Sequence, residues 1–345
     1  MKIQELRDLI KDYPEDRLRL VITEMYRILP KKTIEAMNID QLLKEPDTGK
    51  ARRSAEANKR DFSEVKYDAQ QFLNNAREGY YFIPNRVVAK KDRPKWRFVA
   101  KRLHKELLDQ CQSEENLNES SLLLTAIYNV LCQGCGVYLF SSEDPFASVG
   151  IGQQDFYRDV VAVLRKCEAT TKWIEKSVRL IIDNDLDRET IHKDLMFVLM
   201  EFLNTPPLKE QAIALCHMIG KETRKTTERS RDAEYILRER NNHLVNLVFL
   251  VYKSLGEIEA GITYFKQNYR EKDQEVALYC LLKLLEDLGT KDLWLREYEW
   301  AQGQGIQPRE SLATVYSHLK ETGEFTRGNG AIIFHGKNII YRIDS

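Results

Sequence analysis

The sequence of 345 residues lacks the short motifs that mark the common catalytic sites, and it has no long hydrophobic run. It contains no nucleophile-elbow serine motif, no P-loop, no His-Glu-x-x-His zinc motif and no set of kinase motifs. Its longest apolar run, near Leu244–Tyr252, is far too short to span a bilayer. The N-terminus is charged from Lys2 onward, which is not typical of a signal peptide. We therefore expect a cytoplasmic protein with no membrane partner and no cofactor. An enzyme whose site is assembled from distant residues is the third class that remains open.

Cysteine and proline are also sparse. Six cysteines in a chain of this length do not predict a disulfide framework. Cys132 and Cys135 form a single Cys-x-x-Cys, whereas a zinc site would need a second close pair, so we expect two reduced structural thiols. Metal or redox use of this pair is the alternative. No proline lies between Pro207 and Pro308, so no proline interrupts the helices of that stretch.

The most informative stretch runs from Trp173 to Leu288, where apolar residues recur at steps of three and four. That spacing places them on one helical face and predicts a succession of amphipathic helices. The fold class is therefore mainly α, an irregular helical-hairpin array similar to an α-solenoid. Residues 301–325 resemble a single tetratricopeptide or pentatricopeptide unit, but no second copy matches, so we assign no family. The expected helices of this stretch lie near residues 173–182, 189–202, 208–219, 244–255, 258–269 and 276–288.

Short segments with a preference for β structure stand apart from the helical pattern. The runs 331–335 and 338–343 flank Gly336-Lys337, a pair that suits a two-residue hairpin turn. They predict a small C-terminal β-hairpin, which needs a further strand or a helix to pack on. The segment near residues 80–89 is our candidate for that strand. A second candidate strand, Val137–Phe140, follows Gly134 and Gly136, which we expect to end the preceding helix.

Charge is balanced overall but unevenly distributed. Residues 1–105 contain 25 Lys/Arg and 16 Asp/Glu, whereas residues 106–345 contain 28 and 37. Such asymmetry indicates either an anionic partner for the basic part or docking of one part on the other. We therefore divide the chain into a basic N-terminal helical region (1–105), a helical array (106–325) and the C-terminal hairpin (326–345).

The most basic window of the chain is Arg86–Lys105, with nine Lys/Arg residues and one acid, Asp92. Cations at this density with Trp96 among them are typical of a surface that binds phosphates and stacks a base. In the alternative, Trp96 belongs to the core and the charges are solvated, because Trp96 keeps helical spacing with later apolar residues. The candidate contact residues are Arg86, Lys90, Lys91, Arg93, Lys95, Trp96, Arg97, Lys101, Arg102 and Lys105.

Residues 183–189 carry acids at alternate positions, namely Asp183, Asp185 and Asp187. Such spacing offers oxygen ligands as a calcium loop does, but Arg188 stands where a glycine normally permits the sharp turn. We favour the alternative that Asp185 or Asp187 caps the following helix. His192 follows Glu189 at the spacing of di-iron bundles, but no second Glu-x-x-His pair is present, so we expect an exposed or locally bonded histidine.

Two hypotheses on function follow from these patterns. In the first, the chain is a non-enzymatic scaffold that offers a groove or concave face to a protein or peptide partner. In the alternative, it binds nucleic acid or another polyanion through the basic segment Arg86–Lys105.

Overall fold

The computed structural model describes residues 3–36, 39–44, 60–82, 89, 91, 95–225, 231–325, 333–335 and 338–340. This part of the chain is mainly helical, as predicted. Internal contacts divide the chain into two units, Met1–Asp61 and Phe62–Ser345. The boundary suggested at residue 105 falls within a helix of the second unit. In the described ranges, no helix combines the length and the apolar content that crossing a bilayer requires.

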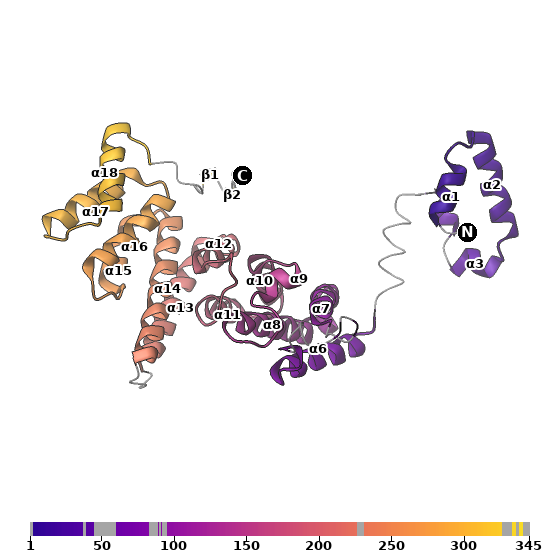
Figure 1. Cartoon of the computed structure of the whole chain (residues 1–345), viewed down its shortest axis with the longest axis horizontal. Coiled ribbons are helices and arrows are strands. Elements are labelled where there is room, and N and C mark those ends of the chain that lie inside the picture. The colour runs from indigo at the N-terminus through magenta and orange to yellow at the C-terminus, as the bar shows by residue number, and fades with distance from the viewer. Residues whose placement is uncertain are drawn as a thin grey trace. The chain divides into compact units, whose positions relative to one another are not determined.

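The N-terminal unit is built from short helices (Figure 1). They are α1 (Ile3–Ile10), α2 (Glu15–Ile28), α3 (Lys31–Ala36) and α4 (Ile39–Lys44). Helix α2 begins after Pro14, and Glu15 and Asp16 lie in its first turn, where the helix dipole favours acids. The Tyr26 hydroxyl donates a hydrogen bond of 2.6 Å to Asp40 Oδ1, which ties α2 to α4. Of the residues in this unit whose side chains are described, none is buried.

The second unit begins with α6 and contains the core of the protein. Its first elements are α6 (Phe62–Arg77), the 3-10 helix η1 (Tyr80–Phe82), α7 (Trp96–Gln110), α8 (Glu114–Gly136), α9 (Pro145–Val149) and α10 (Gln153–Cys167). They are followed by α11 (Thr170–Ile182), α12 (His192–Phe202), α13 (Pro206–Lys225), α14 (Arg231–Leu255) and α15 (Ile258–Asn268). The last elements are α16 (Gln274–Asp287), α17 (Lys291–Gly303), α18 (Glu310–Thr322), β1 (Ile333–His335) and β2 (Asn338–Ile340).

Helices of the second unit pack mainly on their neighbours in sequence. Helices α6, α7 and α8 contact one another, α8 contacts α10, and α11 and α12 lead on to α13 and α14. Helices α13 and α14 form a long hairpin (Figure 1), and each of the helices from α14 to α18 contacts the next. One continuous hydrophobic core runs through the unit from Val65 to Leu319.

Glycines and one acid, rather than prolines, separate the helices from α14 to α17. Gly256 and Gly289 have φ values of +86° and +65°, a conformation that side chains with a Cβ rarely adopt, and each follows the end of a helix. Before α16, the Asp273 carboxylate accepts a hydrogen bond of 2.9 Å from the backbone N–H of Glu275. Such caps end and restart helices in a stretch whose apolar spacing is continuous.

Helix α8 ends at Gly136, one of the two glycines predicted to end it, and the described residues 137–140 do not form the predicted strand. Gly134, the other glycine predicted to end the helix, lies inside it, and the ring of Phe140 packs against it. A Cβ added to Gly134 would lie 2.6 Å from Phe140 Cδ2. At position 134, glycine does not end the helix. It lets the Phe140 ring lie close to the helix backbone.

Tyr80–Phe82 forms η1, so this part of the predicted strand near residues 80–89 is wrong. Tyr81 is buried, its ring centroid lies 5.3 Å from that of Phe72, and its carbonyl accepts a hydrogen bond from Ser141. Residues 83–88 lie outside the described part. The strands β1 and β2 pair antiparallel, with Phe334 opposite Ile339. The predicted turn residues Gly336 and Lys337 also lie outside it.

Candidate functional site

Helix α7 carries the described part of the basic window and has two distinct faces. Ala100, Leu103 and Leu107 are buried against the core, and their spacing fixes the rotation of the helix. The opposite face is left to solvent. There Arg97, Lys101 and Lys105 are exposed and follow one another at steps of four, which stacks them along one side of the helix. We call these three residues the basic ridge.

The basic ridge is not neutralised by neighbouring acids. Among the residues that the structure describes, none of its three cations has a carboxylate within ion-pair distance. Lys95 is likewise exposed at the start of α7, and Lys91 is exposed before it. Three or more like charges on one helical face repel one another, so an anion that bridges them lowers the free energy of the surface.

Arg102 differs from the cations of the basic ridge because it is paired with acids, although it belongs to the same basic window of the sequence. Its guanidinium lies 2.9 Å from the Asp68 carboxylate on α6 and 3.8 Å from that of Glu106. These pairs tie α6 to α7. Arg102 is therefore a structural cation in this surface rather than one that awaits an anionic partner.

Trp96 cannot stack a base, which corrects its place among the candidate contact residues. Its side chain is 4% exposed and its ring centroid lies 4.4 Å from that of Phe140. The indole N–H donates a hydrogen bond of 3.3 Å to Ser141 Oγ. The alternative interpretation, in which Trp96 belongs to the core, is the one that the packing supports.

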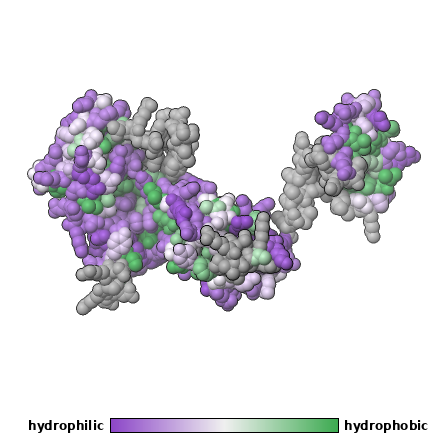
Figure 2. Space-filling view, in the orientation of Figure 1, coloured by the Kyte–Doolittle hydropathy of each residue, from purple (hydrophilic) through white to green (hydrophobic). Residues whose placement is uncertain are grey.

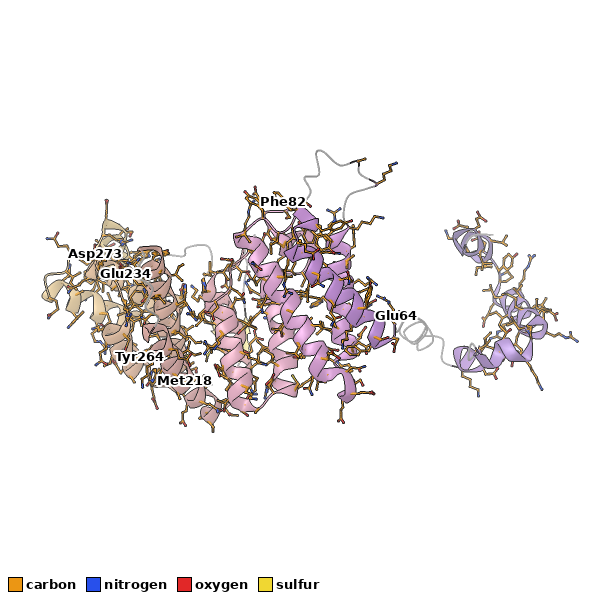
Figure 3. All side chains as sticks on the ribbon, turned by 90° about the horizontal axis from the view of Figure 1, so that it is seen from below. Glu64, Phe82, Met218, Glu234, Tyr264 and Asp273 are labelled. Carbon is orange, nitrogen blue, oxygen red and sulfur yellow. The ribbon has the colours of Figure 1, made fainter. Side chains whose placement is uncertain are left out.

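Other aromatic side chains take the exposed positions near this helix. Phe98 is 61% exposed, and the Arg97 guanidinium lies 4.9 Å from the centre of its ring. Phe82 and Tyr138 are also exposed, with ring centroids 5.8 Å apart. Figure 3 shows Phe82 at one end of the helices around α6. No sequence pattern indicates Tyr138, because its pairing with Phe82 joins residues that are far apart in the chain.

Three of the predicted cations, Arg86, Lys90 and Arg93, lie outside the described residues. The described candidates therefore separate into one buried aromatic residue, one paired cation and a set of exposed cations. The exposed set comprises Lys91, Lys95, Arg97, Lys101 and Lys105.

The acidic loop between α11 and α12 is held together by hydrogen bonds within the protein. Asp183 forms an ion pair of 2.6 Å with Arg240, and Asp187 Oδ1 accepts from the backbone N–H groups of Glu189 and Thr190. The buried amide of Gln153 donates to the Asp185 carbonyl and accepts from the Asp187 N–H. Within the described ranges, no group of three or more acidic, histidine or cysteine side chains is placed to share a metal ion.

Neither Asp185 nor Asp187 caps α12, which corrects that detail of the prediction. Helix α12 begins at His192, and the carboxylate of Asp194 accepts a hydrogen bond of 2.9 Å from the backbone N–H of Ile191. The reason lies in the preceding turn, where Asp187 Oδ1 already accepts hydrogen bonds from the backbone N–H groups of Glu189 and Thr190.

The Cys132-x-x-Cys135 pair lies in the last part of α8, with both thiols free. Burial raises the pKa of Cys135 to about 12 and raises the pKa of Cys132 still further. Gln153 Nε2 lies 3.3 Å from Cys132 Sγ, and the Cys135 thiol donates to the Leu131 carbonyl. A redox pair needs a lowered pKa on the attacking thiol, so these two environments favour structural thiols.

A wide, shallow hollow of about 840 Å³ lies beside the start of α16 and the connection from α17 to α18. Asp273, which Figure 3 labels, lies on its wall. Arg309 and Glu275, which both line the hollow, form an ion pair with each other. The Arg309 guanidinium contacts the two carboxylate oxygens of Glu275 at 2.8 and 2.6 Å. This ion pair links α16 to the start of α18, so the two charges serve the packing of these helices.

Comparison with protein-family models, with curated proteins and with solved structures finds no match for this chain. The function must therefore be argued from the surfaces themselves.

Proposed function

We propose that the chain is a non-enzymatic helical scaffold that binds a protein partner through the apolar side of its N-terminal unit. The single observation that carries the proposal is that this side has exposed apolar residues and no fully buried one. Ile22 and Met25 are 49% and 55% exposed, and α2 has no buried residue. We call this side the α2 face. It consists of Leu18, Val21, Ile22, Met25, Tyr26 and Leu29.

Leaving the α2 face exposed to water lowers the stability of the small N-terminal unit. Ordering one residue costs about 1–2 kcal/mol of backbone entropy. Fully burying a side chain such as Ile22 or Met25 contributes about 1.5–3 kcal/mol. Helix α2 has no buried residue and so lacks that contribution, which a partner that covers the α2 face supplies. Figure 2 shows hydrophobic side chains grouped on the surface of this unit.

A second copy of the chain is the partner that we propose first. Residues 3–44 contain eight Lys/Arg and eight Asp/Glu, so two copies of this part do not repel each other. Most soluble assemblies are closed homo-oligomers, and an isologous dimer lets one apolar face cover its equivalent. In this proposal the second unit, whose helices contact their neighbours in sequence, is a solenoid-like array that the N-terminal unit brings together in pairs.

Sedimentation velocity of the full chain at several concentrations tests this proposal. We expect the wild type to dimerise and Ile22→Glu or Met25→Glu to remain monomeric with unchanged far-UV circular dichroism. Thr23→Glu adds the same charge one residue along, at an exposed position outside the α2 face, and should still dimerise. A wild-type chain that stays monomeric at all concentrations, or a Thr23→Glu variant as defective as Ile22→Glu, would contradict the proposal.

The unpaired basic ridge favours polyanion binding as a second candidate function. Its cations are exposed at one side of α7, and Phe98 beside them offers a ring to an unstacked base. Each phosphate contact that is lost should reduce the slope of log affinity against log salt by about 0.7–0.9.

Fluorescence anisotropy with a single-stranded oligonucleotide at several salt concentrations tests this second candidate. We expect the affinity of the variant Arg97→Gln, Lys101→Gln, Lys105→Gln to be at least tenfold lower than that of the wild type. The slope of its log affinity against log salt should be smaller by about two to three. The control variant Arg165→Gln, Lys166→Gln, Lys172→Gln removes the same residue types from exposed positions of α10 and α11. Equal affinity of the two triple variants would exclude the ridge as the binding surface.

A further inference from the structure

A partly enclosed cavity of about 200 Å³ lies where α13, α14 and α15 meet. Helix α13 contributes His217 and Lys221, α14 contributes Asn241 and Leu244, and α15 contributes Tyr264 and Asn268. Figure 3 labels Tyr264 on α15 and Met218, the residue that follows His217 on α13. No acidic side chain belongs to the wall of this cavity.

His217 is the most unusual group in the cavity. Its ring lies flat against Tyr264, with centroids 5.0 Å apart and an angle of 23° between the planes. Its Nε2 atom is buried and has no hydrogen-bond partner in the described part of the protein. An unpaired buried polar atom costs about 1–3 kcal/mol, so a ligand atom that hydrogen-bonds to Nε2 stabilises the site.

Lys221 lies one helical turn after His217 and supplies the charge. Its side chain is exposed at the cavity, and within the described residues it takes part in no ion pair. With His217 neutral, the cavity has a single positive charge and thus matches a single negative charge on the ligand. Burial and the charge of Lys221 lower the pKa of His217, so the empty cavity disfavours a second positive charge.

The remaining wall determines the size and polarity of the ligand. Leu244, Val245 and Cys216 are apolar, and the Asn241 amide is used in a hydrogen bond of 2.9 Å to the Asn268 carbonyl. A volume near 200 Å³ corresponds to about six or seven waters at about 30 Å³ each. A short carbon chain with one carboxylate fills that space and leaves its apolar part on Leu244.

We propose that this cavity binds a small monocarboxylate, whose oxygens lie between His217 Nε2 and the Lys221 ammonium and whose carbon chain packs on Leu244. The role differs from scaffolding and from polyanion binding, because it uses a partly enclosed cavity rather than an exposed face. An anion next to His217 favours the imidazolium, so binding is accompanied by proton uptake and tightens as the pH falls from 7.5 to 6.

NMR of the histidine rings in the full chain tests the proposal, with butyrate as the probe and butyramide as the neutral molecule of the same shape. We expect butyrate to shift the His217 signals saturably, with a dissociation constant in the roughly millimolar range, and to raise the pKa of His217. Butyramide should bind at least fivefold more weakly. The spectrum of His217→Gln assigns the His217 signals.

Gly220→Ala is the most selective variant for this cavity. An added Cβ would lie 3.8 Å from Leu244 Cδ1, which is ordinary contact, so the methyl group occupies the cavity without a clash. Alanine also favours the helix, so the fold is retained. We expect at least a tenfold loss of butyrate binding. Gly303→Ala, at a helical position with nothing within 4 Å of the added Cβ, should bind as the wild type does.

Lys221→Gln should weaken butyrate binding about tenfold and leave butyramide unchanged, and Lys172→Gln serves as the surface control. Three results would overturn the proposal. They are a His217 signal that butyrate does not shift, equal binding of butyrate and butyramide, and unimpaired binding to Gly220→Ala.

Discussion

The imidazole rings of His192 and His243 stack on each other, with centroids 3.6 Å apart and planes inclined by 12°. His192 is the first residue of α12 and His243 lies in the middle of α14, so the stack forms part of the contact between these helices. Burial lowers the pKa of His192 to about 4 and, together with the charge of its partner, lowers the pKa of His243 to about 3. The packed state therefore requires both rings to be neutral.

This stack predicts that stability decreases on mild acidification. A histidine whose pKa is lower in the folded state binds its proton more readily when unfolded, so stability is complete above the unfolded value of 6.5 and is lost as the pH falls toward 4. We expect the free energy of unfolding to fall by about 2–3 kcal/mol between pH 7 and pH 5. Urea unfolding at each pH measures it. His243→Phe keeps an aromatic stack without a titrating group and should show a smaller fall. An equal fall in both proteins would exclude the stack as the cause.

The close approach of Phe140 to Gly134 predicts a large effect of one methyl group. In Gly134→Ala the added Cβ would lie 2.6 Å from the Phe140 ring, which itself packs on Trp96. Overpacking of this kind costs about 1–3 kcal/mol and outweighs the helix preference of alanine, about 1 kcal/mol. We expect a net loss of stability in urea unfolding. Gly303→Ala, with open space around its Cβ, should be neutral or slightly stabilising. Equal effects of the two changes would contradict the packing argument.

Apolar spacing predicted most of the helical structure. A helix that packs on the core by one face has apolar residues at steps of three and four, and this spacing is visible in the sequence. The segments expected near residues 258–269 and 276–288 match α15 and α16 within a few residues. Of the two glycines predicted to end α8, Gly136 is its last residue, whereas Gly134 lies inside it. The ring of Phe140 packs on Gly134, a contact that spacing along the chain does not show.

The candidate sites were less accessible to sequence reasoning, since their properties come from distant residues. The acid that neutralises Arg102 is Asp68, 34 residues earlier, so the sequence could not separate Arg102 from the basic ridge. Trp96 satisfied both the basic-window pattern and the helical apolar pattern, and only its contact with Phe140 chooses between them. The cavity is lined by residues of three helices, among them His217, Asn241 and Tyr264, and no spacing pattern along the chain predicts it.

The buried amide of Gln153 predicts a strong dependence of the 183–190 loop on one side chain. It joins α10 to this loop through hydrogen bonds of 3.0 Å to the Asp185 carbonyl and 2.8 Å from the Asp187 N–H. In Gln153→Leu both backbone groups lose their partner, which costs about 1–3 kcal/mol for each buried group left unpaired. We expect a loss of about 2–4 kcal/mol in urea unfolding and faster amide exchange in the loop. Gln154→Leu, at the half-buried neighbouring position, should change stability by less than about 1 kcal/mol. Unchanged exchange in Gln153→Leu would show that the amide does not hold the loop.

Thiol labelling tests whether the cysteines serve packing or chemistry. Burial raises the pKa of Cys111 to about 11 and of Cys216 to about 12, as it does for Cys135. Only the thiolate reacts, so at pH 8 these groups hold about a thousandth or less of their thiols in the reactive form. With Ellman's reagent we expect the folded chain to show slow reaction at these positions and all six cysteines to react rapidly in 8 M urea. Mass spectrometry after short labelling identifies the modified residues. Rapid labelling of Cys135, or a disulfide between Cys132 and Cys135 under mild oxidation, would reopen a redox role. Slow labelling at both supports thiols that act as small apolar side chains in α8.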